Sequence, residues 1–221
     1  MKTHPLLVLV GTGFLLSQTA FLAGFVSPTS YDMPNGNGHA SGGTFNYWDQ
    51  EYTGAGSTTV DNAPLSGGLG NLTDGVIPTD NWHLVENHAG TGPYVGWTLD
   101  PTITFNFAGP VYIDDIILHL DDANGFGGVQ LPSAISVSVD GGLPGVQVVI
   151  DPVTANPIAV TIDLNQTVTG TIDIGLKRSS FWVFLSEVQF TGATSGVPDA
   201  GSGWMMLGGS LAFLASIRRR R

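Results

Sequence analysis

Aliphatic side chains alternate with polar or small ones in several short runs, and this pattern constrains the fold most strongly. In residues 135–139 the aliphatic positions are separated by serines, and residues 158–164 repeat the pattern with alanine, threonine and aspartate between them. Because successive side chains of a strand point to opposite faces, each run predicts a strand with one buried face. Residues 111–120 (VYIDDIILHL) end in the same way, with Ile117 and His119 on the face opposite the core.

The remaining predicted strands come at fairly regular spacing. They span residues 44–52, 102–107, 146–150, 169–176 and 181–191. No stretch between residues 30 and 196 combines a long helical period with good helix formers. Short strands and frequent glycine turns predict an all-β chain, and the length favours an antiparallel jelly-roll β-sandwich of about eight strands.

The N-terminal part of the chain departs from this pattern. Residues 1–23 begin with a positive charge at Lys2, continue with an apolar run and end with small residues. This is the layout of a secretory signal peptide, and cleavage is expected after Ala23; a retained N-terminal membrane helix is the alternative. Residues 24–43 are rich in Pro, Gly, Asn and Ser and predict a flexible leader, so the sandwich is expected over residues 44–192.

Residues 193–221 predict a C-terminal sorting signal. A turn-forming motif comes first, an apolar segment from Trp204 to Ile217 follows, and the chain ends with Arg218, Arg219, Arg220 and Arg221. The apolar segment has 14 residues. As a helix it would be about 21 Å long, shorter than a hydrocarbon core of about 30 Å. It therefore suits transient insertion in the inner membrane, with the arginines as a cytoplasmic stop; a buried or amphipathic C-terminal helix is the alternative.

The turn-forming motif resembles a known class of sorting signals. Val197, Pro198, Asp199, Gly201 and Ser202 match the VPDSG-type variant of the PEP-CTERM signals, and Ala200 replaces the usual serine. The resemblance implies that an exosortase cuts near the motif after export through the secretion translocon. It also implies release or re-anchoring at the cell surface. The activity of the upstream domain does not follow from it.

Charge and cysteine content narrow the possible partners. Of the 18 acidic residues only Asp199 lies outside residues 24–197, and of the seven basic residues only Lys177 and Arg178 lie inside, so this region has a net charge of −15. Such a surface repels nucleic acid and anionic lipid, and it either attracts divalent cations or keeps the protein soluble. The absence of cysteine excludes disulfides, thiol catalysis and zinc–thiolate sites.

Three segments of the predicted sandwich resemble a second family. They are residues 72–75 (LTDG), 132–141 (PSAISVSVDG) and 184–192 (FLSEVQFTG). Their order and spacing are similar to those of the galactose-binding-like sandwiches, which include discoidin or F5/8 type C domains and many carbohydrate-binding modules. The resemblance spans most of the expected domain and implies the same sandwich fold.

The same resemblance implies a structural calcium ion. In that family an Asp-Gly turn and a glutamate of the last strand commonly hold Ca²⁺, which points to Asp74 and Glu187, with Thr79 or Asp80 as a further ligand. Calcium binds six to eight oxygen ligands, and Gly75 would let the turn bring its carbonyl groups toward one ion. The alternative is that Asp74 is an ordinary turn residue and that Glu187 points to solvent.

Aromatic residues supply the candidate carbohydrate contacts. A pyranose has an apolar C–H face and hydroxyl edges, so its site needs an aromatic platform with polar groups nearby. Trp82 and His83 lie in one loop-rich stretch, and Trp182 and Phe126 could join them across the fold. Trp97 precedes a strand and is expected in the core.

Two pairs of acidic residues are weaker candidates. Asp114–Asp115 and Asp121–Asp122 lie near the two ends of one predicted strand and could form a glycosidase pair. Because neighbours on a strand face opposite sides, we expect solvated or turn residues instead. Three function classes therefore remain: a module that binds extracellular polysaccharide at the cell surface or in the matrix, a structural matrix protein without a small-molecule ligand, and, least favoured, an enzyme.

Overall fold

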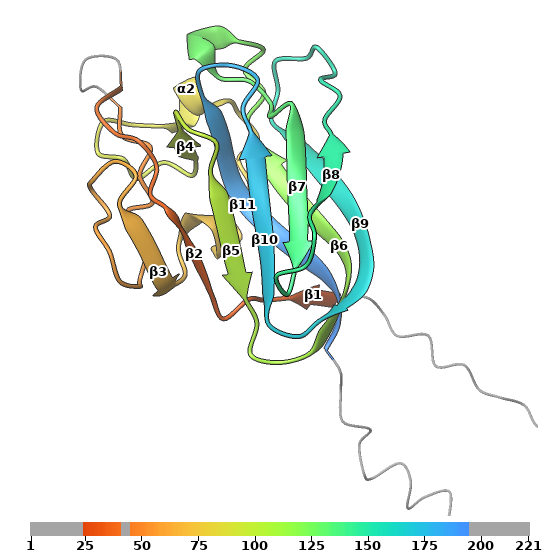
Figure 1. Ribbon diagram of the computed structural model, residues 1–221. Helices are drawn as coiled ribbons and strands as arrows, with labels where there is room; N and C mark the ends of the chain where they lie inside the picture. Colours follow the sequence, from red (N-terminus) through yellow and green to blue (C-terminus); the bar gives the residue numbers. More distant parts are fainter. Residues whose placement is uncertain (1–23, 41–44, 195–221) are drawn as a thin grey trace, which may run out of the picture.

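Two antiparallel sheets pack face to face in the computed structural model, which describes residues 24–40 and 45–194 (Figure 1). The predicted antiparallel β-sandwich is therefore confirmed. Its strands are β1 (Gly24–Val26), β2 (Ser30–Pro34), β3 (Pro64–Gly68), β4 (Val95–Trp97), β5 (Thr102–Asn106), β6 (Val111–Leu120), β7 (Ala134–Val139), β8 (Gly145–Val148), β9 (Ile158–Val168), β10 (Thr171–Lys177) and β11 (Val183–Thr194). The loops of this described part contain three short helices, η1 (Asn71–Thr73), α2 (Trp82–Val85) and η2 (Phe126–Gly128).

The last strand, β11, lies at the centre of the first sheet. That sheet runs in the order β1-β11-β6-β9, and β4 pairs with the first residues of β11. The second sheet runs β3-β2-β5-β10-β7-β8. All strand pairs are antiparallel, which is the arrangement that lets one face of each sheet contact the core.

The core fills the space between the sheets. From the first sheet Ile116, Leu118 and Phe190 are buried, and from the second Phe105 and Ile172 are buried. The rings of Phe105 and Phe190 meet edge to face with centroids 5.1 Å apart. The alternation in the sequence thus correctly predicts which face of each central strand points inward.

The predicted flexible leader over residues 24–43 is wrong for its described part. β2 pairs with β3 and β5 inside the second sheet, and Tyr31 packs against Phe105. Only two side chains of β2, Tyr31 and Met33, are large and buried. The residues around them are polar or small, so the sequence of this segment resembles a loop and the short alternation does not stand out.

The predicted strand over residues 44–52 is also wrong. Between residues 45 and 52 the backbone forms only an isolated bridge, in which Phe45 pairs with Ala40. Tyr47 and Trp48 are nevertheless buried. The aromatic content of this segment therefore indicated burial of its side chains, not a regular strand.

The two ends of the sandwich differ in what they carry. The helix α2 and the loop that contains η2 lie at one end, whereas β1 and the C-terminal end of β11 lie at the other (Figure 1). The predicted signal peptide and nearly all of the predicted sorting signal lie outside the described residues. Within residues 24–40 and 45–194, no helix has the length and apolar character needed to cross a membrane.

Candidate functional site

A pocket of about 340 Å³ lies at the α2 end of the sandwich. Segments far apart in the sequence form its wall: residues 37–40, α2, the loop that contains η2, and the residues leading into β11. Its aromatic lining consists of Tyr47, Trp82, Phe181, Trp182 and Phe184. The fold therefore gathers aromatic side chains of five positions around one concave surface.

The two tryptophans predicted as ligand contacts both line this pocket, and they lie deep in it. Trp82 is 7% exposed and Trp182 is 8% exposed. The Tyr47 ring lies between them, edge-on to both, with centroids 5.9 Å from Trp82 and 5.2 Å from Trp182. We therefore assign these three rings to the floor of the pocket.

The accessible aromatic surface belongs to two phenylalanines. Phe181 is 62% exposed and packs edge-on against Trp182, and Phe126 is 61% exposed and stacks on Trp82. His83 is not part of the lining, but its ring lies 4.9 Å from that of Phe126. The sequence analysis gave Phe126 less weight than Trp82 and did not single out Phe181, because sequence alone does not show which of two neighbouring aromatic rings is exposed.

The polar wall of the pocket, formed by Asp61 and Asn37, was not predicted. Asp61 lines the pocket, and its Oδ1 atom accepts hydrogen bonds from the Trp48 indole N–H and the Gly38 amide, each at 2.7 Å. Asn37 lines it too, and its Oδ1 atom accepts from the Thr98 amide at 3.0 Å. Neither residue lies in a motif, so only their position in the fold reveals them.

The loop that contains η2 reaches the pocket because of its glycines. Gly125, Gly127 and Gly128 all have positive φ angles, which glycine adopts at little cost. Gly127 has φ 65°, and a Cβ atom there would lie 2.5 Å from the Trp82 ring. A side chain at this position would therefore displace the floor of the pocket.

Two buried carboxylates lie beside the floor. The Trp82 amide donates a hydrogen bond to Asp121 Oδ2 (3.0 Å), and the Tyr94 amide donates to Glu86 Oε1 (2.8 Å). The second oxygen of each carboxylate is buried without a hydrogen-bond partner. Burial raises the pKa of Glu86 to about 8 and that of Asp121 to about 7, and the charge of Asp121 adds to the rise at Glu86.

The predicted solvation of Asp121 and Asp122 is therefore wrong. Both are fully buried, because the chain leaves β6 underneath α2 and not into solvent. Asp122 uses Oδ1 to accept a hydrogen bond from the Asn124 amide at 3.1 Å, as expected of a turn residue. Asp114 and Asp115, at the other end of the strand, are half-buried on β6.

The turn at Asp74 contacts Glu187, although the Asp74 carboxylate itself accepts a hydrogen bond from the Val76 amide at 2.8 Å, as in an ordinary turn. The Gly75 amide donates a hydrogen bond to Glu187 Oε2 at 3.1 Å, which joins the turn at Asp74 to β11. Glu187 is only 5% exposed, and burial raises its pKa to about 7, with a further contribution from the charge of Asp74. The alternative that Glu187 points to solvent is therefore excluded.

Asp80 does not join this pair. Its carboxylate accepts from the Thr79 hydroxyl at 3.2 Å, and its carbonyl accepts from the Tyr94 hydroxyl. Among residues 24–40 and 45–194, no group of three or more His, Asp or Glu side chains has a metal-binding arrangement. Asn71, in the helix η1, has a buried Oδ1 atom without a hydrogen-bond partner.

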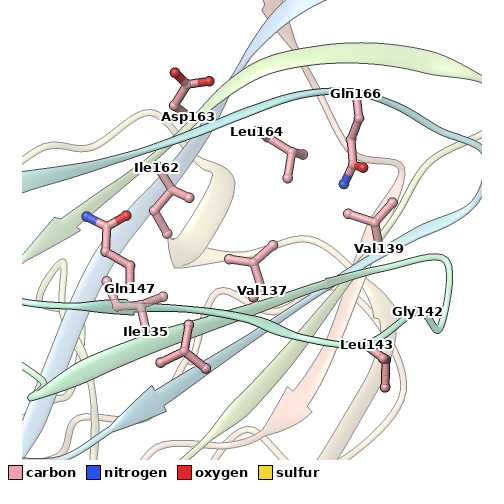
Figure 2. A pocket seen from close by; sticks show the side chains of 12 residues that line it. Ile135, Val137, Val139, Gly142, Leu143, Gln147, Ile162, Asp163, Leu164 and Gln166 are labelled. Atoms are coloured by element: carbon pink, nitrogen blue, oxygen red, sulfur yellow. The ribbon is translucent and has the colours of Figure 1, made fainter.

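A second cavity, of about 420 Å³, lies between the sheets at the edge formed by β8 and β9. Figure 2 shows Val137 of β7 and Leu164 of β9 facing into it from the two sheets. No aromatic side chain lines it. It therefore lacks the platform that a sugar ring needs.

Comparisons with known proteins bear on the fold and the family. No curated protein matches the chain. Solved structures that resemble it include the F5/8 type C domain of a Bacteroides fragilis protein, with 15% identity, 78% of this chain and 97% of that chain covered, and a TM-score of 0.41. Another is a family 32 carbohydrate-binding module from Clostridium perfringens NanJ, in complex with galactose. It has 9% identity, with 44% of this chain and 75% of that chain covered, and a TM-score of 0.34.

A fucolectin from striped bass (Morone saxatilis) has 11% identity, with 75% of this chain and 72% of that chain covered, and a TM-score of 0.37.

A family model gives the more specific assignment. It is that of the discoidin domain-containing receptor 1/2 DS-like domain, and it matches residues 28–192, a range that begins just before β2 and ends within β11. The chain belongs to the discoidin domain-containing receptor 1/2 DS-like domain family.

Proposed function

We propose that this protein is exported and that its sandwich binds carbohydrate of an extracellular polysaccharide through the pocket at the α2 end. The observation that carries the proposal is the pairing of an aromatic floor with two exposed rings, Phe126 and Phe181. A pyranose can place its apolar face on such a ring while its hydroxyl groups reach the polar wall at Asp61 and Asn37. The pocket has the volume expected of a small-molecule site.

The position of the pocket supports this role. It lies at the end of the sandwich opposite Thr194, where the described chain ends and the sorting signal follows in the sequence (Figure 1). A protein held at the cell surface through its C-terminal side would present the α2 end outward. In this proposal an exosortase processes the chain at the motif around Asp199, and the domain acts without catalysis.

A structural calcium ion near Glu187 forms part of the proposal. The buried carboxylate of Glu187 and the exposed turn at Asp74, which are joined by the hydrogen bond from the Gly75 amide, would supply oxygen ligands. The ion would neutralise a carboxylate that pairs with no lysine or arginine among the described residues. It would tie η1 to β11 and would not take part in sugar binding.

A glycan array tests the binding proposal. The wild-type protein should bind at least one glycan, and Phe181→Ala should lose that signal because it removes an exposed platform without touching the core. Phe25→Ala is the matched control, since Phe25 is also exposed but lies in β1 at the other end. Binding that survives Phe181→Ala but not Phe25→Ala would refute the assignment of the pocket.

One observation favours the alternative of a structural matrix protein. β8 is an edge strand, and aliphatic residues on and after it, including Val148 and Ile150, are highly exposed. An unprotected apolar edge can pair with another chain. A wholly blank glycan array, together with self-association that Val148→Lys abolishes, would favour this alternative over carbohydrate binding.

A further inference from the structure

We propose that the pocket at the α2 end selects sugars by charge, taking amino sugars with a free ammonium group most tightly, neutral sugars less tightly and acidic sugars least. This inference rests on the proposed carbohydrate-binding function and names the class of ligand for the same pocket. It follows from the charged groups around the pocket and from its aromatic rings.

The first observation is the carboxylate in the wall. Both hydrogen bonds that Asp61 accepts from described residues, from Trp48 and Gly38, engage Oδ1. No described residue donates to Oδ2, so this oxygen can accept a hydrogen bond from a ligand. A charged acceptor forms stronger bonds with an ammonium group than with a hydroxyl, and it repels a carboxylate.

The second observation is the position of the buried acids. The Trp82 amide donates a hydrogen bond to Asp121, and the Glu86 amide donates one to the Trp82 carbonyl, so both acids lie near the floor. Because burial raises the pKa of Glu86 to about 8 and that of Asp121 to about 7, both acids are largely protonated at pH 6.5. They therefore add little charge of their own at that pH, and the charge next to a bound ligand is that of the Asp61 carboxylate, with no lysine or arginine in the lining.

The third observation is the scarcity of positive charge. Within residues 24–40 and 45–194 the only Lys and Arg residues are Lys177 and Arg178. Arg178 approaches the rim, where it donates a hydrogen bond to the Phe181 carbonyl at 2.6 Å, but its Nε atom also pairs with Asp100 at 3.2 Å. The nearest guanidinium is thus already committed, and no lysine or arginine lines the pocket.

The aromatic lining favours the same ligand class. An ammonium group near the face of an aromatic ring is attracted by the ring quadrupole, more strongly where water is displaced. Phe181 presents an exposed ring beside the pocket, with the Trp182 ring behind it at 5.7 Å. A carboxylate placed there would be repelled by the same quadrupole.

Two matched series of monosaccharides test the inference by calorimetry or NMR titration of the whole protein. They are glucose, glucosamine and glucuronic acid, and galactose, galactosamine and galacturonic acid, each measured at pH 6.5. In the series that binds, the amino sugar should bind about three- to tenfold more tightly than the neutral sugar. The acidic sugar should bind more weakly than the neutral one.

Asp61→Asn provides the site-specific readout, because the asparagine oxygen can keep the bonds from Trp48 and Gly38. The variant should lose most of the preference for the amino sugar over the neutral sugar and most of the discrimination against the acidic sugar. Asp114→Asn, which removes one charge from β6, is the matched control and should change neither.

The possible failures are distinguishable. If neutral sugars bind but amino sugars bind no more tightly, or acidic sugars bind equally well, the charge selection is wrong and the proposed function stands. An unchanged amino-sugar preference in Asp61→Asn would also overturn it. If none of the six sugars binds and the glycan array is blank, both the inference and the proposed function are wrong.

Discussion

The backbone amide of Trp82 donates a hydrogen bond to the carboxylate of Asp121, with 3.0 Å between N and Oδ2. This bond ties the first residue of α2 to the end of β6 and holds the tryptophan of the pocket floor against the sandwich. Asp121 is fully buried and pairs with no lysine or arginine of residues 24–40 and 45–194. The position of the floor therefore depends on a carboxylate in an apolar setting.

We predict that the protein loses stability as the pH rises. Burial raises the pKa values of Asp121 and Glu187 to about 7 and that of Glu86 to about 8. In the unfolded chain these groups titrate near pH 4, so between about pH 4 and pH 8 the folded state binds more protons than the unfolded state. Their protonated forms stabilise the fold fully below about pH 4, and this contribution is lost as the pH rises through the folded-state values.

Thermal unfolding without added calcium checks this prediction. The midpoint should fall between pH 5 and pH 8, with a loss of a few kcal/mol, since one unit of pKa shift corresponds to about 1.4 kcal/mol. Glu86→Gln combined with Asp121→Asn should flatten the dependence. A midpoint that rises over this range would show that the buried carboxylates are charged and compensated in the folded protein.

We predict that Gly127→Ala disrupts the pocket and leaves the sandwich folded. The new Cβ atom would meet the Trp82 ring at 2.5 Å, and alanine is strained at φ 65°. We expect a loss of about 1–3 kcal/mol in the free energy of unfolding and a changed near-ultraviolet circular dichroism spectrum. Gly109→Ala, in open space on the loop after β5, should be nearly neutral, and equal effects of the two substitutions would contradict the packing described here.

Calcium should stabilise the protein through Glu187. At a concentration 100 times its dissociation constant, an ion that binds only the folded state adds about 2.7 kcal/mol, which corresponds to a rise of roughly 5–10 °C in the midpoint for a domain of this size. Glu187→Gln should abolish the rise, whereas Asp80→Asn should retain it because Asp80 lies outside the pair. An unchanged midpoint of the wild type in calcium and in chelator would rule out the ion.

The mature protein should lack both terminal signals. Mass spectrometry of protein from its native host should show an N-terminus after Ala23 and a C-terminus near the motif that contains Asp199. Asp199→Ala should leave the apolar segment attached and retain the protein in the inner membrane. Full-length wild-type protein at the cell surface would contradict processing by an exosortase.

The sequence predicted the central strands well because their alternation is a local property. Residues 111–120 form β6 as expected, and the buried face carries the predicted side chains. It failed for β2 and for residues 44–52, where burial depends on strands far away in the chain. Tyr31 is buried by pairing with β3 and β5, which no short window of sequence contains.

The candidate site was only partly predictable for the same reason. Trp82 and Trp182 do line one pocket, as their residue type suggested. Residue type does not show, however, whether a ring lies in the floor of the pocket or at its rim. Phe181 is exposed because its neighbour Trp182 takes the inward position. Asp61 contributes through its bonds to Trp48 and Gly38, and no motif marks that arrangement.

The most direct test of carbohydrate binding maps the bound sugar on the protein. In ¹H–¹⁵N NMR spectra of the labelled protein, titration with each of the six monosaccharides should move the Trp182 indole N–H and Phe181 amide signals. The Gly109 amide, at the opposite end of the sandwich, should not move. Shifts confined to the cavity between β7 and β9, or no shift with any of the sugars, would contradict the account.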